Sequence, residues 1–260
     1  MIFDTKPAIV GHRGYGAGSP DGFRENSVES FLAAARSGIP WVELDARRSR
    51  DGELVLWHDP VTPAGQPVIS LTADELAAAG IVRLAQVLTA LPASVSVDID
   101  VKTVIEDATD PQPQRTHALI ARALREFRET RQFLVSSFDP SLPVYLADRK
   151  AETGDVALGW ITEDNYPASH AVSGAANLGL NALCVHTGTL RTYPRRVLDF
   201  AHRAGLEVMA WSPEPGEALQ LGRYGIDAVC VNDIPGAQAA LKPLYPAREN
   251  PAGAHLRAGR

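Results

Sequence analysis

The sequence predicts an α/β fold, and within that class a closed (β/α)8 barrel of the TIM type. Three observations lead to this prediction. The chain has 260 residues, a length that barrels of this kind fill as one domain. Short runs rich in Val, Ile and Leu alternate with helical stretches along nearly the whole chain, the pattern of a parallel sheet covered by helices. There are about eight such regular runs, and eight parallel strands close a barrel.

The expected elements follow one another in regular order. Strands are expected at residues 8–13, 41–46, 95–102, 133–138, 156–161, 182–186, 207–212 and 228–232. Helices are expected at residues 27–37, 84–91, 115–129, 140–148, 170–178, 193–204, 215–224 and 235–241. The first helix has one apolar face at helical spacing, formed by Val28, Phe31, Leu32 and Ala35. Asn26 is expected to cap this helix with the help of Glu29, and Gly38 to end it.

One further apolar run breaks this alternation. Residues 54–58 follow the strand at 41–46 after only a short turn that contains Asp51 and Gly52. Such a turn joins antiparallel strands, whereas neighbouring parallel strands need a much longer crossover. We therefore expect an extra strand that leaves the barrel mouth and turns back over it.

Composition and charge limit the possible classes of protein. Hydrophobic residues at 45% and charged residues at 22% exclude a disordered chain, a collagen-like repeat and a coiled coil. A formal net charge of −6 gives no support to a nucleic-acid partner. We expect residues 1–244 to form a single domain and residues 245–260, rich in Ala, Pro, Gly and Arg, to be a flexible tail.

Targeting segments are not expected. Residues 1–7 lack a basic stretch followed by an apolar core, so we expect no signal peptide. No window approaches the roughly 18 apolar residues of a transmembrane segment, and the expected compartment is the cytoplasm. Cys184 and Cys230 lie inside apolar runs and are expected to be buried free thiols. The sequence leaves the oligomeric state open.

Acidic residues occupy the interior face of two predicted strands. Because side chains alternate along a strand, Glu43 and Asp45 share one face, as do Asp98, Asp100 and Lys102. Two carboxylates about 4 Å apart repel by about 4 kcal/mol at an effective dielectric near 20, so they need a positive partner. Acids that face one another from different strands indicate a divalent cation with oxygen ligands, Mg²⁺ or Ca²⁺.

Lys102 is an unusual choice for this chain. Lysine occurs only at positions 6, 102, 150 and 242, and the other basic residues are arginines. A lysine inside an acidic strand favours a role that needs a compact ammonium group. The alternative is a simple ion pair with Asp100.

Two histidines lie beside the same strand ends. His12 and Arg13 lie at the end of the first strand, and His58 closes the extra strand. Two imidazoles next to an oxygen-ligated cation suit phosphodiester hydrolysis, because one can take a proton from the attacking hydroxyl while the other protonates the leaving alkoxide. The metal, Arg13 and Lys102 would offset charge on the phosphoryl oxygens. Spacing alone leaves phosphate and carboxylate substrates both open.

The polar motifs also occur in a characteristic order. They are His12-Arg13-Gly14, Glu25-Asn26-Ser27, Glu43-Leu44-Asp45, Asp51-Gly52, His58-Asp59, Asp100-Val101-Lys102, Ser136-Ser137-Phe138 and Asn232-Asp233-Ile234-Pro235. Their order and spacing resemble the signature of the glycerophosphodiester phosphodiesterases. The resemblance implies a barrel of the phospholipase C-like phosphodiesterase type. It also implies hydrolysis of small-molecule glycerophosphodiesters to an alcohol and sn-glycerol 3-phosphate.

The resemblance also implies a role for each candidate residue. The histidines that match His12 and His58 are the acid–base pair of the family, and which one is the base stays open. The other implied roles are metal binding by Glu43, Asp45 and Asp100, phosphate binding by Arg13 and Lys102, and a wall of the substrate pocket at Trp211. Plain packing is the alternative for Trp211, and His186 is a further candidate for substrate contact.

The chain departs from the family pattern at the acidic strand. Asp100 stands where these enzymes usually have Glu, as it does in the related sphingomyelinase D-type phospholipases. One alternative is therefore a phospholipase D or sphingomyelinase D-like enzyme that cleaves lysolipids or sphingomyelin. A second alternative is an inactive barrel that binds phosphate esters. The segment from Pro60 to Ile81 is short, so the barrel mouth is expected to be open.

Overall fold

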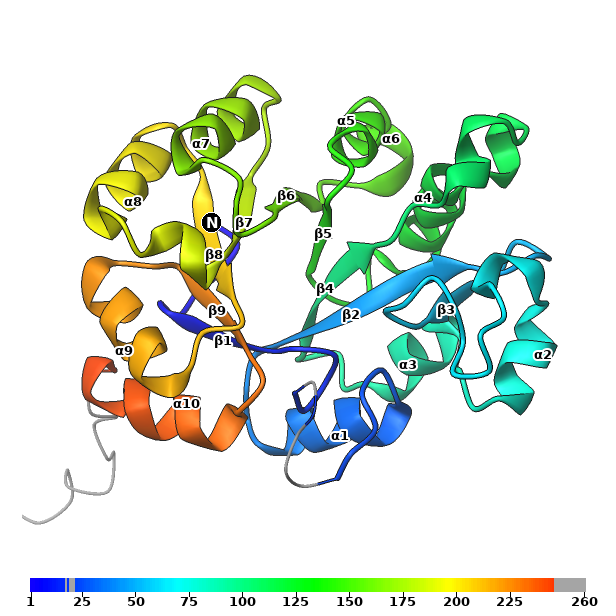
Figure 1. The fold of residues 1–260 in the computed structure, drawn as a ribbon, viewed down its shortest axis with the longest axis horizontal. Coiled ribbons are helices and arrows are strands. Elements are labelled where there is room, and N and C mark those ends of the chain that lie inside the picture. The colour runs from blue at the N-terminus through cyan, green and yellow to red at the C-terminus, as the bar shows by residue number, and fades with distance from the viewer. Residues whose placement is uncertain (17, 19–21, 246–260) are drawn as a thin grey trace, which may run out of the picture.

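The computed structural model describes residues 1–16, 18 and 22–245 and confirms the predicted barrel (Figure 1). Nine strands are described, namely β1 (Ala8–Gly11), β2 (Trp41–Arg48), β3 (Leu54–Leu56), β4 (Ser96–Val101), β5 (Phe133–Ser137), β6 (Ala157–Thr162), β7 (Ala182–His186), β8 (Glu207–Trp211) and β9 (Ala228–Val231). Every strand except β3 pairs in parallel with its neighbours, in the order β1-β9-β8-β7-β6-β5-β4-β2. Pairing of β1 with β2 closes the cylinder.

Helices surround this cylinder. The described α-helices are α1 (Val28–Arg36), α2 (Ala73–Ala78), α3 (Leu84–Ala90), α4 (Thr116–Phe127), α5 (Ser141–Ala147), α6 (Lys150–Thr153), α7 (Ala168–Asn177), α8 (Pro194–Arg203), α9 (Pro215–Tyr224) and α10 (Ile234–Leu241). The larger apolar core lies between the strands and these helices. Each of the eight parallel strands runs from the floor of the barrel to its mouth, where the loops after these strands gather (Figure 1).

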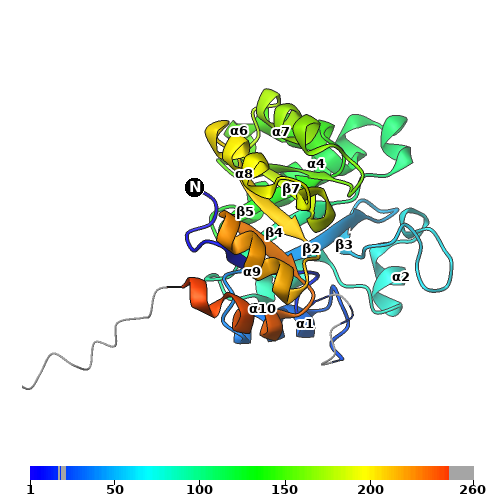
Figure 2. The same cartoon turned by 60° about the vertical axis from the view of Figure 1, so that its left-hand side comes forward.

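The expected extra strand is confirmed. β3 pairs antiparallel with the end of β2, with Ala46 opposite Leu56 and Arg48 opposite Leu54. Together with α2 it projects from the mouth, at the end of the barrel away from the chain's first residue (Figure 2). The hairpin thus places the residues that follow β3 at the mouth of the barrel (Figure 2).

The cap of the first helix was predicted wrongly. Ser27, not Asn26, is the N-cap of α1, because the Ser27 side chain accepts a hydrogen bond from the backbone N–H of Ser30. Asn26 adopts a left-handed backbone conformation with φ of 55°, and its buried side chain bonds to Asp45 instead. Asn26 therefore belongs to the turn before the helix, where it binds Asp45 and does not cap α1.

Two short helices were not expected from the sequence. The signal for α2 was present, because Thr72 and Glu75 form a capping box in the Thr-x-x-Glu spacing that marks a helix start. The single turn α6 is too short to show an apolar period. Among the described helices none is long and apolar enough to cross a membrane.

The floor of the barrel is closed by the start of the chain. Ile2 and Phe3 are buried in a second apolar cluster inside the cylinder. The Phe3 ring packs edge-on against Trp41, with 5.2 Å between the ring centroids. Cys184 and Cys230 belong to the same cluster, and both are buried free thiols as expected. The tail predicted at 245–260 lies, from residue 246 onward, outside the described residues.

Candidate active site

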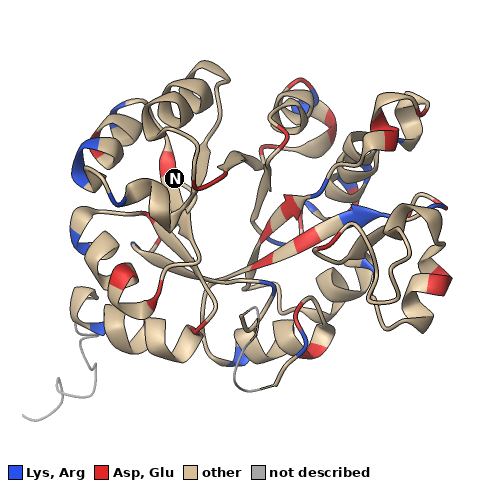
Figure 3. Ribbon diagram, in the orientation of Figure 1, with Lys and Arg blue, Asp and Glu red and all other residues tan. Residues whose placement is uncertain are grey.

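Paired acids line the interior of the barrel below its mouth. β2 and β4 are in register so that Glu43 lies beside Asp98 and Asp45 beside Asp100. All four are buried, and acidic positions on β2 and β4 are visible in Figure 3. Glu43, Asp45 and Asp100 each offer a carboxylate oxygen within 4.8 Å of the others. The structure thus brings together the three residues predicted as metal ligands.

Burial makes these carboxylates costly to ionise without a cation. Burial, together with the neighbouring Asp45 and Asp100, raises the pKa of Glu43 well above its usual value. Burial likewise raises the pKa of Asp100 to about 6 and that of Asp98 to about 8. Ser136 donates a hydrogen bond of 2.8 Å to Asp98. This bond lowers the pKa of Asp98 but offsets only part of the effect of burial.

Two basic residues partly neutralise the negative charge of these carboxylates. Lys102 lies between two acids, with Nζ 3.1 Å from Asp45 Oδ1 and in direct contact with Asp100. Arg13 places Nε 3.2 Å from Asp45 Oδ2 and donates from Nη1 to Glu25. Although burial opposes the ionisation of Asp45, Lys102 and Arg13 hold its pKa below the usual value.

The acidic cluster has unused acceptor capacity. Asp100 Oδ1 and Asp98 Oδ2 are buried and accept no hydrogen bond within the described part of the chain. Buried acceptors of this kind normally have a partner. A donor set made only of carboxylate oxygens fits a hard cation such as Mg²⁺ or Ca²⁺. Glu43, Asp45 and Asp100 would hold such an ion.

His12 lies at the end of β1 with a defined tautomer. Its Nδ1 is 2.6 Å from Asn232 Oδ1, and because that oxygen only accepts, Nδ1 carries the hydrogen. Burial lowers the pKa of His12 to about 4, with a further contribution from Arg13. The neutral ring therefore presents the lone pair of Nε2, which lies 3.9 Å from Glu43 Oε2.

His58 reaches the cluster from the hairpin after β3. Its Nδ1 is 2.7 Å from Asp59 Oδ1, and its ring is more exposed than that of His12. The backbone carbonyl of His58 accepts hydrogen bonds from Nε and Nη2 of Arg47. Arg47 is a buried residue near the end of β2, so the acidic strand also anchors this histidine.

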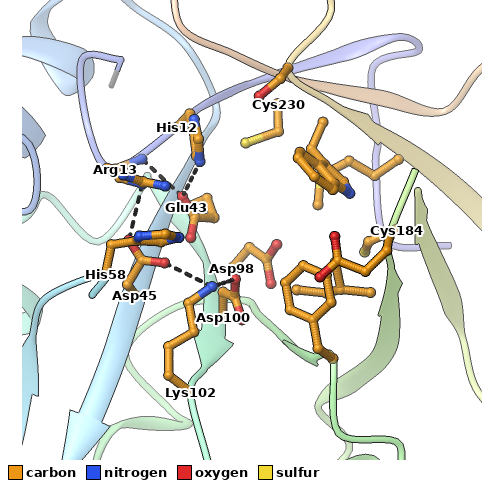
Figure 4. Close-up of a pocket in the computed structure, with 16 residues that line it drawn as sticks. His12, Arg13, Glu43, Asp45, His58, Asp98, Asp100, Lys102, Cys184 and Cys230 are labelled. Carbon is orange, nitrogen blue, oxygen red and sulfur yellow. Dashed lines mark hydrogen bonds and ion pairs between the residues drawn. The ribbon is translucent and has the colours of Figure 1, made fainter. Parts of the chain in front are cut away.

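The four acids, the two histidines, Arg13 and Lys102 all line one cavity of about 420 Å³. Figure 4 shows His12, His58, Arg13 and Lys102 gathered around the carboxylates, with Cys184 and Cys230 on the other side. The strands β5 to β8 supply this other side with Phe138, Ile161, Glu163, Cys184, Met209 and Trp211. One half of the cavity is thus charged, and the other half is largely apolar.

Trp211, for which the sequence predicts a place in the wall of the substrate pocket, lines this cavity. Its ring lies 6.3 Å from that of Phe138 and 4.4 Å from that of His186, measured between centroids. His186 packs behind Trp211 and accepts a hydrogen bond from Gly188 N, and it is not among the residues that line the cavity. The structure therefore does not bring His186 to the site.

Sequence reasoning missed several residues of the site. Asn26 was assigned to a helix cap, and Asn232 and Glu163 received no role. Arg47 was also overlooked, although it follows Glu43 and Asp45 on the same face of β2. Continuing that alternation two more positions would have found it.

Comparison with known proteins places this geometry in a family. Residues 12–235 match the family model of the glycerophosphoryl diester phosphodiesterase family. A glycerophosphocholine phosphodiesterase of Schizosaccharomyces pombe is 37% identical over 75 residues, which are 26% of this chain and 7% of that protein. The matched segments span between 4% and 18% of the length of the curated relatives.

Solved structures are similar over nearly the full length. A phosphodiesterase from Oleispira antarctica in complex with the product sn-glycerol-3-phosphate has a TM-score of 0.74 and 22% identity, and the match covers 91% of this chain and 97% of that one. A glycerophosphodiester phosphodiesterase from Parabacteroides distasonis has a TM-score of 0.75 and 17% identity, covering 92% and 98%. These likenesses confirm the fold. On the match to the family model, the chain belongs to the glycerophosphoryl diester phosphodiesterase family.

Proposed function

We propose that this protein hydrolyses glycerophosphodiesters to an alcohol and sn-glycerol 3-phosphate, using a divalent cation and two histidines. One observation carries the proposal: His12, His58 and the three acids of the predicted metal site line a single cavity together with Arg13 and Lys102. The family match over residues 12–235 supports it. The product named for the Oleispira antarctica structure is consistent with the same chemistry.

The bound cation would supply Lewis-acid stabilisation of charge on the phosphoryl oxygens. Glu43, Asp45 and Asp100 are the residues that would hold it. Arg13 and Lys102 face the same space and are suited to bind the remaining phosphoryl oxygens, because both keep a positive charge at neutral pH.

The hydrogen bonds of the two histidines suggest different proton roles. His12 offers an unprotonated Nε2, since Asn232 fixes the hydrogen on Nδ1, and is suited to take a proton from the attacking water. His58 is suited to protonate the leaving alkoxide as the bond between phosphorus and the alcohol oxygen breaks. The Asp59 carboxylate, 2.7 Å from Nδ1, offsets the charge of the His58 imidazolium. The products are the alcohol and a phosphomonoester.

The proposal is tested by incubating the protein with glycerophosphocholine and either Mg²⁺ or Ca²⁺, then assaying sn-glycerol 3-phosphate. Release that depends on the ion would support it. No release with either ion, across several headgroups, would contradict it. A parallel incubation with lysophosphatidylcholine distinguishes a phospholipase D-like activity, which would cleave the acylated substrate in preference.

Two expectations about the whole protein accompany this proposal. Residues 1–244 are expected to act as a single domain, which limited proteolysis tests by the size of the resistant fragment. A cytoplasmic location is expected as well, and cell fractionation tests it. Neither expectation bears on the chemistry of the cavity.

A further inference from the structure

The rim of the barrel is divided into two halves of different chemistry. The strands β1 to β4 and the loops after them carry the acid–histidine cluster, and the ends of β5 to β8 carry Phe138, Glu163 and Trp211. A phosphodiester bound at the cluster has one ester substituent on each side of phosphorus. One substituent therefore extends over the second half of the cavity.

Glu163 is the one acid among the cavity-lining residues of this second half. It follows β6 directly and is exposed to solvent. The basic residues of the cavity are engaged elsewhere, since Arg13 pairs with Glu25 and Asp45, and Lys102 with Asp45 and Asp100. No ion pair in the described part of the chain includes Glu163. Its charge therefore remains available to a ligand.

Two aromatic rings stand in the same half of the cavity. The rings of Phe138 and Trp211 are nearly perpendicular, at 78°, with centroids 6.3 Å apart, and Phe138 is 37% exposed. Aromatic faces attract cations, and quaternary ammonium groups bind to clusters of such rings. Lys102 Nζ already lies 5.2 Å from the Phe138 centroid, which shows that this ring tolerates a cation nearby.

We propose that Glu163, with Phe138 and Trp211, forms a subsite for a cationic headgroup, so that the protein selects glycerophosphodiesters of choline or ethanolamine. This inference rests on the proposed function. A diester of choline is a zwitterion whose cation Glu163 attracts, whereas a diester of a second glycerol is an anion that Glu163 repels. The buried apolar side chains of Ile161 and Met209 line the same half of the cavity and suit the methyl groups of choline.

The experiment compares kcat/KM for glycerophosphocholine with kcat/KM for glycerophosphoglycerol. Glu163→Gln is expected to lower the ratio of the two about fivefold, the size of a partly exposed charge interaction. Glu163→Lys is expected to lower the ratio further and to improve the anionic substrate. Asp164→Asn is the matched control, because Asp164 is an exposed neighbouring acid outside the cavity lining, and its ratio should equal that of the unmodified protein.

Choline binding supplies a readout that does not need turnover. Choline alone should bind the metal-loaded protein, and both Glu163→Gln and Phe138→Leu should weaken it at least about threefold. A substrate ratio unchanged in both Glu163 variants, or choline affinity equal in all variants, would overturn the inference. Failure to hydrolyse any diester, with choline binding that still depends on Glu163, would contradict the proposed function but support the cation subsite.

Discussion

The guanidinium of Arg47 holds the backbone of His58 in place. The His58 carbonyl oxygen accepts hydrogen bonds from Arg47 Nε at 2.9 Å and from Nη2 at 2.6 Å. This contact ties the hairpin that carries one proposed acid–base residue to the strand that carries Glu43 and Asp45. The position of His58 is therefore set by the strand that bears two of the proposed metal ligands.

Replacing Arg47 with Met should lower kcat about 10- to 100-fold and leave KM nearly unchanged. Hydrogen bonds to a charged group are worth about 1.5–3 kcal/mol, and each 1.4 kcal/mol is about tenfold in rate. Steady-state kinetics measures the effect, with thermal unfolding recorded in parallel. Arg47→Lys should recover part of kcat, and Arg50→Met, an exposed arginine of the same hairpin, should have none of this effect. Equal kcat in Arg47→Met and Arg50→Met would remove the positioning role.

His12→Ala and His58→Ala should each lower kcat by about 10²–10⁴-fold, the usual contribution of a positioned acid or base. Both variants should keep the unfolding temperature of the parent within a few degrees, because neither ring belongs to the apolar clusters. Stopped assays of sn-glycerol 3-phosphate measure the turnover. Unchanged turnover in either variant would exclude that histidine from the mechanism.

Removing divalent ions with a chelator should abolish activity and lower the unfolding temperature, because an ion that binds only the folded protein stabilises it by mass action. Adding Mg²⁺ or Ca²⁺ should reverse both effects. Asp100→Asn should lose the ion-dependent rise, since Asp100 Oδ1 is one of the unused buried acceptors. Glu25→Gln, which changes an acid that pairs with Arg13 but is not one of the three predicted ligands, should keep this rise. Equal stabilisation of both variants would argue against Asp100 as a ligand.

Phe3→Ala should destabilise the fold by about 3–5 kcal/mol, the cost of emptying a large buried aromatic site. Phe3 is fully buried in the floor of the barrel and packs against Trp41. Urea unfolding measures the change, and Asp4→Ala, an exposed neighbour, serves as the control. Activity at low temperature should persist in Phe3→Ala, because the floor lies at the opposite end of the barrel from the mouth. A loss below about 1 kcal/mol would mean that the opening segment does not close the floor.

Lys6 should contribute stability that disappears at high pH. Burial opposes its charge, but hydrogen bonds and ion pairs with Asp227 and Glu207 raise the pKa of Lys6 above its usual value. A pKa raised on folding gives stability that is complete below the unfolded-state pKa and is lost as pH rises through the folded-state pKa. The difference in unfolding free energy between the parent and Lys6→Met should therefore shrink above pH 10.5. A difference that stays constant from pH 8 to pH 12 would contradict this.

Much of the fold could be predicted because its signals are local. The alternation of Glu43 and Asp45 with apolar neighbours follows from the covalent geometry of a strand, and it placed both acids inside the barrel. The turn at Asp51 and Gly52 likewise indicated the antiparallel hairpin of β2 and β3. The prediction was wrong where a residue suits two different structural roles. Asn26 suits a helix cap equally well, and only the neighbouring strand decides that it bonds to Asp45.

The sequence by itself determined the class of fold, the positions of its strands and the order of the motifs that mark the family. Closure of the barrel decided which residues far apart in the chain meet at the site. His12 meets Asn232 across 220 positions of the chain, and Glu163, directly after β6, lines the same cavity as Glu43 on β2. Such pairings depend on how strands curve and pack, because no local period links residues that only the closed sheet brings together.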